Sequence, residues 1–193
     1  NATIFEWFND NASIGLPSGG VGDIAAFTAV NNSTVPIVAT INVVSSFSSN
    51  GVVCPGPSET FTITVNPTPI VNPLVDQVIC NGAPSATVNF TGSGNTYTWT
   101  NNNPNIGLVS NGSGDISSFT ALNPTINPIS GTITVIPTAL QCDGSAESFT
   151  ITINPTPIVD PITDIENCAG FVQSSIQPTG NYSAINWVNN NTT

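Results

Sequence analysis

A thirteen-residue segment occurs twice in this chain, and this repetition constrains the fold more than any other feature. FTITVNPTPIVNP ends at Pro73, and FTITINPTPIVDP ends at Pro161, 88 residues later. The flanking sequence repeats too, since residues 13–31 align with 105–123 at a spacing of 92. Solenoids and propellers repeat about every 20–50 residues, whereas this period is long enough for a domain with its own core. The sequence therefore predicts a tandem array of domains.

The alignment places the domain boundaries at the repeated segment. Residues 1–69 are expected to be a β-sandwich repeat truncated at its N-terminal side, and residues 70–157 a complete repeat. Residues 158–193 are expected to be the start of a third repeat, truncated at its C-terminal side.

Within one repeat the hydrophobic residues alternate with a period of two, which is typical of β-strands. The segment TYTWT (96–100) places Tyr97 and Trp99 on one face and threonines on the other. GTITVIP (131–137) and SFTITIN (148–154) alternate in the same way, and Asp143–Gly144 between them is a hairpin signal. No stretch forms a convincing amphipathic helix. The pattern predicts an all-β fold of tandem antiparallel β-sandwiches.

The repeated segment carries the chain from the last strand of one repeat into the next. Proline cannot donate a ladder hydrogen bond and its φ is restricted, so the prolines of NPTPIVNP favour an extended, semi-rigid connector. We expect short proline-rich linkers that give each junction the same angle and spacing.

The chain has eleven carboxylates but no lysine, arginine or histidine. Nucleic-acid binding and attraction to anionic lipid both need cations, so neither partner is expected. Without histidine or lysine there is no Ser–His or Cys–His pair and no Schiff base. No apolar segment approaches the roughly 18 residues of a membrane span. We expect no enzymatic activity, no cofactor and no membrane insertion of this segment.

Four cysteines at repeat-equivalent positions indicate oxidation outside the cytoplasm. Two pairings fit. Cys80 could bond Cys142 within one repeat, with Cys54 and Cys168 bonded to partners outside the segment; alternatively, Cys54–Cys80 and Cys142–Cys168 could bridge the junctions. We favour the first pairing, because a strand and the proline linker carry the chain away between Cys142 and Cys168. Zinc is disfavoured because no C-x-x-C spacing occurs.

The tryptophans and the aspartates near the linkers are the remaining candidates for a site. Trp7, Trp99 and Trp187 are expected in the cores, although a repeated sugar-stacking platform is the alternative. Asp76, Asp160 and Asp164 lie near the junctions, where tandem domains sometimes hold structural calcium. Position 160 is Asn72 in the other copy, so a metal is not our leading expectation.

The segments DQVICNG, YTWTNNNPNIGL, GSGDISSFTALN and FTITVNPTP resemble the PKD-like, immunoglobulin-like repeats of giant secreted adhesins from gliding Bacteroidota, which are exported by type IX secretion. The resemblance covers essentially the whole chain. It implies a cell-surface filament outside the bacterial outer membrane, used for adhesion and gliding motility. Its implied partners are extracellular surfaces or polysaccharide, together with the secretion and motility machinery of the envelope. The family supplies no catalytic residues.

The expected function is therefore a structural and adhesive stalk segment of a large surface adhesin. The alternative is an array of carbohydrate-binding modules on a secreted enzyme, with exposed aromatic side chains that bind sugar. A carboxylate-pair glycosidase is the weakest reading, because it needs two acids about 5–10 Å apart in a cleft.

Overall fold

The computed structural model describes residues 2–188 and is all-β. Its sheets are mainly antiparallel, as expected of the sandwich class. The helical elements among the described residues are two three-residue 3₁₀ turns, η1 (Ala12–Ile14) and η2 (Pro104–Ile106). None of the helices in this part of the chain has the length and apolarity to span a membrane.

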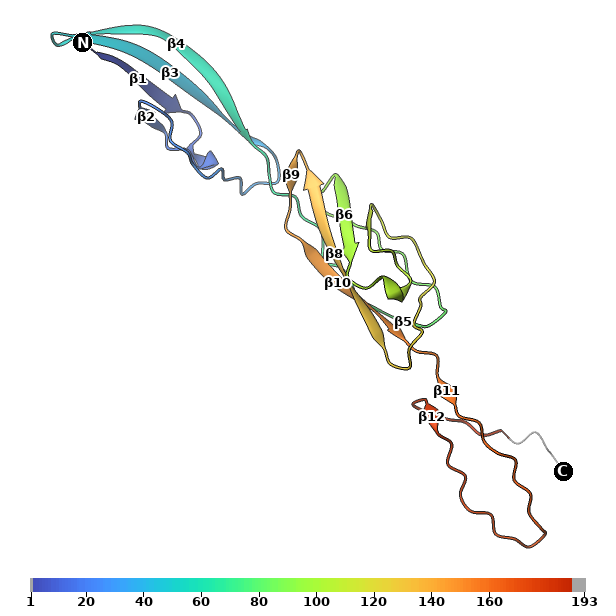
Figure 1. The fold of residues 1–193 in the computed structure, drawn as a ribbon. Helices are drawn as coiled ribbons and strands as arrows, with labels where there is room; N and C mark the ends of the chain where they lie inside the picture. The colour runs from blue at the N-terminus through green and yellow to red at the C-terminus, as the bar shows by residue number, and fades with distance from the viewer. Residues whose placement is uncertain (1, 189–193) are drawn as a thin grey trace. The chain divides into compact units, whose positions relative to one another are not determined.

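The first sheet has the strand order β2-β1-β3-β4, and Figure 1 shows β1, β3 and β4 side by side. Its strands are β1 (Ala2–Asn9), β2 (Gly19–Val21), β3 (Ile37–Ser49) and β4 (Val52–Val65). Strand β1 lies between β2 and β3, so Trp7 is opposite both Gly20 and Val43. Trp7, Ile14, Leu16, Ala39 and Ile41 form the buried core on one face of this sheet.

The second sheet has the order β5-β10-β8-β6-β7, with β9 paired to β8. Its strands are β5 (Gln77–Cys80), β6 (Thr96–Asn101), β7 (Asn111–Ser113), β8 (Ile129–Ala139), β9 (Cys142–Asp143) and β10 (Glu147–Asn154). The predicted alternation is present: Ile133 and Val135 on β8, and Phe149, Ile151 and Ile153 on β10, are buried. Threonines separate these residues and lie on the other face.

Strands β5 and β10 pair in parallel, with Ile151 opposite Gln77 and Asn154 opposite Cys80. The sequence pattern did not indicate this pairing, because a four-residue strand carries no sign of its partner. The consequence is that β5, early in the predicted middle repeat, lies beside β10, its last long strand.

The third sheet is a short pair, β11 (Ile158–Val159) with β12 (Gly180–Asn181). Between them, residues 160–179 contain no strand and appear in Figure 1 as a long open loop. This segment aligns with residues 72–91 at the spacing of 88 but contains no strand corresponding to β5.

The described residues group into two compact units. One contains the residues up to Asn72 with Phe90–Thr98 and Val135–Glu147; the other contains Pro73–Asn89, Trp99–Thr134 and the residues from Ser148 onward. The boundaries predicted at 69/70 and 157/158 do not coincide with this grouping and stay a prediction.

Candidate functional site

A pair of asparagines, the first of them buried, recurs in the first two sheets. At the end of β6, the Asn101 amide nitrogen donates to the Leu108 carbonyl (2.8 Å), and its oxygen accepts from the Asn103 backbone N–H (3.0 Å). At the end of β1, Asn9 makes the same bonds to Leu16 (2.8 Å) and Asn11 (3.0 Å). We call Asn9 with Asn11, and Asn101 with Asn103, the asparagine brace.

The second residue of each brace caps a 3₁₀ turn and ties it to the neighbouring strand. The Asn103 side chain accepts from the Asn105 N–H and donates to the Ser130 carbonyl, 2.9 Å away. Asn11 likewise donates to the Val38 carbonyl at 3.1 Å. Both turns end in a left-handed glycine, Gly15 (φ 92°) and Gly107 (φ 96°), as helix C-termini commonly do. The repeated sequence therefore encodes repeated contacts, spaced by 92 residues.

The linker after β4 is held by the turn between β8 and β9. The Asn66 side-chain amide donates to the Leu140 carbonyl at 3.0 Å. Gly144 lies so close to the linker that a Cβ atom on it would be 1.9 Å from the Pro69 carbonyl oxygen. Pro69 and Pro137 are both fully buried. The proline segment is therefore a packed part of the structure.

The next part of the linker lies against a second glycine, and this contact also recurs. A Cβ atom on Gly92 would collide with the Ile70 carbonyl oxygen, and one on Gly180 would collide with that of Ile158. The Asn72 backbone N–H donates to the Thr91 carbonyl (2.7 Å), and Asp160 N–H donates to Thr179 (2.8 Å). The difference between Asn72 and Asp160 is accommodated by reversing one bond: the Asn72 amide donates to the Thr91 hydroxyl, whereas the Thr179 hydroxyl donates to the Asp160 carboxylate (2.6 Å).

The second linker has polar contacts of its own. The Asn81 side-chain amide donates to the Thr156 hydroxyl (2.9 Å), and that of Asn181 donates to the Ile126 carbonyl (2.7 Å). A shallow cavity of about 400 Å³ lies at this linker, lined by Pro155, Pro157 and Tyr182 among others. The first bond joins the linker to the residue after β5, and the second joins β12 to the loop before β8.

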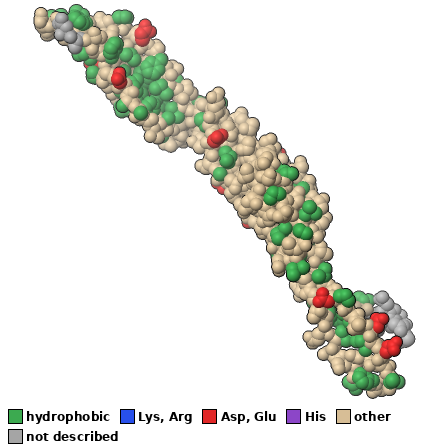
Figure 2. Space-filling model, viewed as in Figure 1, with side chains coloured by type: hydrophobic (Ala, Val, Ile, Leu, Met, Phe, Trp, Pro, Cys, Tyr) green, Lys and Arg blue, Asp and Glu red, His purple; other side chains and the backbone are tan. Residues whose placement is uncertain are grey.

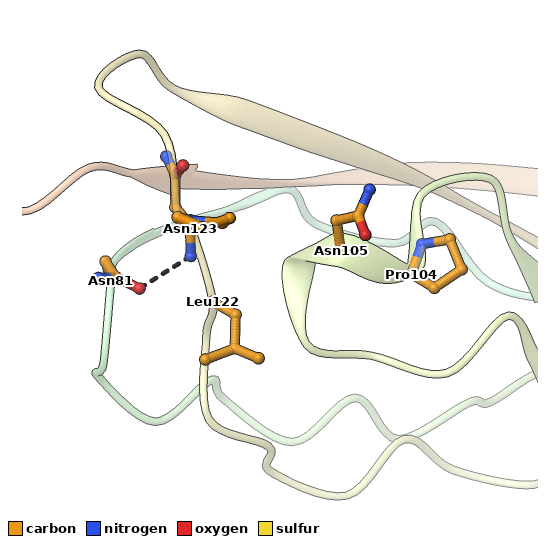
Figure 3. A pocket seen from close by; sticks show the side chains of 6 residues that line it. Asn81, Pro104, Asn105, Leu122 and Asn123 are labelled. Carbon is orange, nitrogen blue, oxygen red and sulfur yellow. Dashed lines mark hydrogen bonds between the residues drawn. The ribbon is translucent and has the colours of Figure 1, made fainter.

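A further cavity of about 500 Å³ lies beside η2 (Figure 3). Asn81 and Asn123 meet at one side of it, where the Asn123 backbone N–H donates to the Asn81 side-chain oxygen at 2.8 Å. Pro104, Asn105, Leu122 and Pro124 complete the lining. Amides and apolar groups can hold a small ligand by hydrogen bonds and contact, but this lining supplies no acid, base or nucleophile.

The tryptophans do not all lie where the sequence predicts. Trp7 and Trp99 are buried, each about 6% exposed, and pack against Gly20 and Gly112. The Trp99 indole N–H donates to the Gly114 carbonyl at 3.1 Å. Trp187 is 61% exposed, so its predicted core position is wrong for this structure. Trp187 lies outside any strand, whereas Trp99 lies on β6 and packs against Gly112 on β7.

The cysteines, all in the described part of the chain, are free thiols, so the predicted Cys80–Cys142 bond is not formed in the structure. Cys80 lies opposite Asn154, the last residue of β10, whereas Cys142 precedes its first residue, Glu147, and lies opposite Ala139. Eight strand residues extend about 23 Å, and a disulfide needs Cα atoms within about 7 Å. Cys54 and Cys168 are exposed.

Two of the three aspartates proposed as calcium candidates accept hydrogen bonds, each at a different place. The Asp76 carboxylate accepts from the Thr150 N–H (2.6 Å), beside the β5–β10 pair, and Asp160 accepts from Thr179. Asp164 lies in the open loop between β11 and β12. Among residues 2–188, no three acidic, histidine or cysteine side chains are grouped as metal ligands would be.

Comparison with known proteins found no family model and no curated sequence that matches the chain.

Proposed function

We propose that this chain is a non-catalytic structural and adhesive segment of a large protein on the exterior of a bacterial cell. It serves as a stalk that carries load between a cell and an extracellular surface or polysaccharide, as in the gliding adhesins that its sequence resembles. On this proposal it is exported by the type IX secretion machinery and moved by the motility machinery of the envelope.

The parallel pairing of β5 with β10 is the observation that carries the proposal. Tension on the chain pulls the start of β5 and the end of β10 in opposite directions. Because the strands are parallel, these two points lie at opposite ends of the pair, and the load falls on all the hydrogen bonds at once. Asp76, which accepts from the Thr150 N–H on β10, adds a bond at the loaded end. An antiparallel pair pulled in this way would instead open one bond at a time.

Single-molecule pulling tests this role with one protein and two attachment geometries. All four cysteines are first replaced by serine, and handles are attached either at both ends of the chain or at the N-terminal end and Ala146. Ala146 lies just before β10, at the end of the β5–β10 pair where β5 begins. Pulling on Ala146 therefore separates the two strands from that end, one hydrogen bond after another. We expect unfolding of the second sheet to need a several-fold higher force in the first geometry. Equal forces would contradict a load-bearing role.

The carbohydrate-binding alternative depends on exposed aromatic side chains. Trp7 and Trp99 are buried, which leaves Trp187 as the exposed tryptophan of the three. Binding to immobilised polysaccharides, measured for the native chain and for Trp187→Ala, separates the two functions. Tight binding that is lost in Trp187→Ala, together with weak mechanical resistance, would favour the alternative.

A further inference from the structure

Three asparagines in this chain are followed directly by glycine: Asn50, Asn81 and Asn111. Asparagine is one of the thermolabile residues of proteins, because the backbone nitrogen of the next residue can attack its side-chain amide carbon and close a five-membered ring. A following glycine favours this reaction, since it has no Cβ atom to hinder the approach and leaves the backbone free to rotate. The sequence treats the three sites alike, whereas the fold holds them differently.

At Asn81, hydrogen bonds hold both groups that would react. The Asn81 side-chain oxygen accepts from the Asn123 N–H (2.8 Å), and its nitrogen donates to the Thr156 hydroxyl (2.9 Å). The N–H of Gly82, which would have to lose its proton and attack, donates to the Ala121 carbonyl at 2.8 Å. Ring closure at this site would break all three bonds, so the fold protects Asn81.

Asn111 is held by a strand. Asn111 and Gly112 lie in β7, which pairs with β6. The Trp99 ring packs so closely on Gly112 that a Cβ atom there would collide with it. In an extended strand the next backbone nitrogen lies away from the side-chain amide carbon, so ring closure requires the backbone at Asn111 to rotate. That rotation would pull the strand from β6 and from the indole ring.

Asn50 lies in the two-residue turn between β3 and β4, where Ser49 is opposite Val52. Asn50 and Gly51 are both exposed, with φ of 51° and 79°. Among residues 2–188, neither the Asn50 side-chain amide nor the Gly51 N–H makes a hydrogen bond. In the same part of the chain, only the adjoining residues come within 4 Å of where a Cβ atom on Gly51 would lie. The backbone of this turn can therefore rotate without losing a contact.

We propose that Asn50–Gly51 is a site of spontaneous modification, at which the asparagine is converted to aspartate and isoaspartate as the protein ages. The deprotonated Gly51 nitrogen forms a bond to the Asn50 side-chain carbon, and the bond from that carbon to the side-chain nitrogen breaks, which releases ammonia. Water then opens the resulting succinimide ring. Opening at the former side-chain carbon gives aspartate, and opening at the main-chain carbon gives isoaspartate, in which the chain continues through the side chain.

The modification changes both the charge and the length of the turn. Each product adds a carboxylate to the eleven that the chain already carries. Isoaspartate also inserts a methylene group into the main chain, and the length of a hairpin turn determines the register of its strands. The disturbance should stay at the turn end of the hairpin, because the buried Ala39 and Ile41 lie near the other end of β3.

The conversion is measured in the full chain, kept at mildly alkaline pH under reducing conditions, either folded in buffer or unfolded in guanidinium chloride. Chymotrypsin is used for digestion, because the chain has no lysine or arginine for trypsin. Cleavage after Phe61 separates Asn50 from Asn81, and cleavage after Trp99 separates Asn81 from Asn111. Mass spectrometry then gives the converted fraction at each asparagine, and electron-transfer fragmentation distinguishes aspartate from isoaspartate.

In the folded chain we expect Asn50 to convert at least several-fold faster than Asn81 and Asn111, and to give both products. In guanidinium chloride the three sites should convert at comparable rates. Asn50→Gly is the matched control, because Gly-Gly also suits this turn, and it should remove the acidic species that appear first on anion exchange. The proposal would be overturned if Asn50 lagged behind either other site in the folded chain, if folding left the relative rates unchanged, or if Asn50→Gly formed acidic species as fast as the native chain.

Discussion

At the scale of the residue, the asparagines of this chain act as small connectors between backbone groups. Asn101 is buried and uses its nitrogen as a donor and its oxygen as an acceptor at the same time. A carboxylate offers only acceptors and a hydroxyl is too short to reach both partners, so the position is specific for asparagine. Among residues 2–188, the neighbouring Asn102 side chain makes one hydrogen bond, in which its oxygen accepts from the Thr132 N–H at 2.8 Å. The two neighbours should therefore tolerate substitution differently.

This difference can be measured with one substitution at each position. Asn101→Asp places a carboxylate against the Leu108 carbonyl and should lower the free energy of unfolding by about 2–3 kcal/mol. Asn102→Asp should change it by less than about 0.5 kcal/mol, because Asp10 already holds the corresponding position and accepts from the Thr40 N–H at 2.7 Å. Urea denaturation at neutral pH gives both values, and equal losses would argue against the specific role of Asn101.

The two buried tryptophans differ in their hydrogen bonding. Trp99 donates to the Gly114 carbonyl, whereas the Trp7 indole N–H has no hydrogen-bond partner among residues 2–188. Replacement by phenylalanine keeps an aromatic ring but removes the N–H. We expect Trp99→Phe to cost about 1 kcal/mol more than Trp7→Phe, the net value of a typical hydrogen bond. Thermal denaturation of the two variants, followed by circular dichroism, makes the comparison; a larger loss for Trp7→Phe would contradict it.

At the scale of the element, the hairpin before β10 turns earlier than the sequence predicts. Asp143–Gly144 was the expected turn, but the tight turn is Leu140–Gln141, where φ is 49° and 64°. Gly144 is needed instead for its close approach to Pro69. The corresponding turn of the first sheet is Asn50–Gly51, the pair that this left-handed geometry favours. The turn of the second sheet therefore places Leu140 and Gln141 at positive φ, a conformation that neither residue favours.

Copying the first turn into the second should relieve this mismatch. The double substitution Leu140→Asn with Gln141→Gly retains the backbone carbonyl that binds Asn66 and should raise the free energy of unfolding by about 1 kcal/mol. Gly144→Ala is the contrasting variant and should destabilise the chain, because its Cβ has no space beside Pro69. Chemical denaturation decides both, and an unchanged or lower stability for the double variant would contradict the argument.

The alternation of hydrophobic residues was sufficient to predict the all-β fold and the strands that contain Trp99, Ile133 and Ile151. It could not predict which edge β5 would join, because pairing between distant strands depends on contacts that no local pattern encodes. The burial of Trp187 was inferred from its equivalence to Trp99, but equivalence in sequence supplies no packing surface. The predicted Cys80–Cys142 bond was wrong for a different reason. The parallel β5–β10 register places these two residues at different ends of β10. The linker contacts of Asn66 and Gly144 were also missed, because both residues look like ordinary turn residues.

At the scale of the whole molecule, the charge is all of one sign: eleven acidic side chains and no lysine, arginine or histidine. Figure 2 accordingly shows no basic side chain on the face drawn. The acids that the structure engages, such as Asp10 and Asp76, accept hydrogen bonds from backbone N–H groups instead of cationic side chains. Cohesion therefore depends on hydrophobic burial and hydrogen bonds, while the long-range electrostatic energy is repulsive.

The dependence of stability on salt follows from this charge distribution. Added NaCl shortens the screening length to about 10 Å at 0.1 M, which weakens repulsion between carboxylates and leaves no side-chain ion pair to be weakened in return. The melting temperature should therefore stay constant or rise as NaCl increases from low concentration. The measurement is made by circular dichroism at neutral pH. A melting temperature that falls steadily with added NaCl would contradict this prediction, because it would show that attractive charge interactions stabilise the fold.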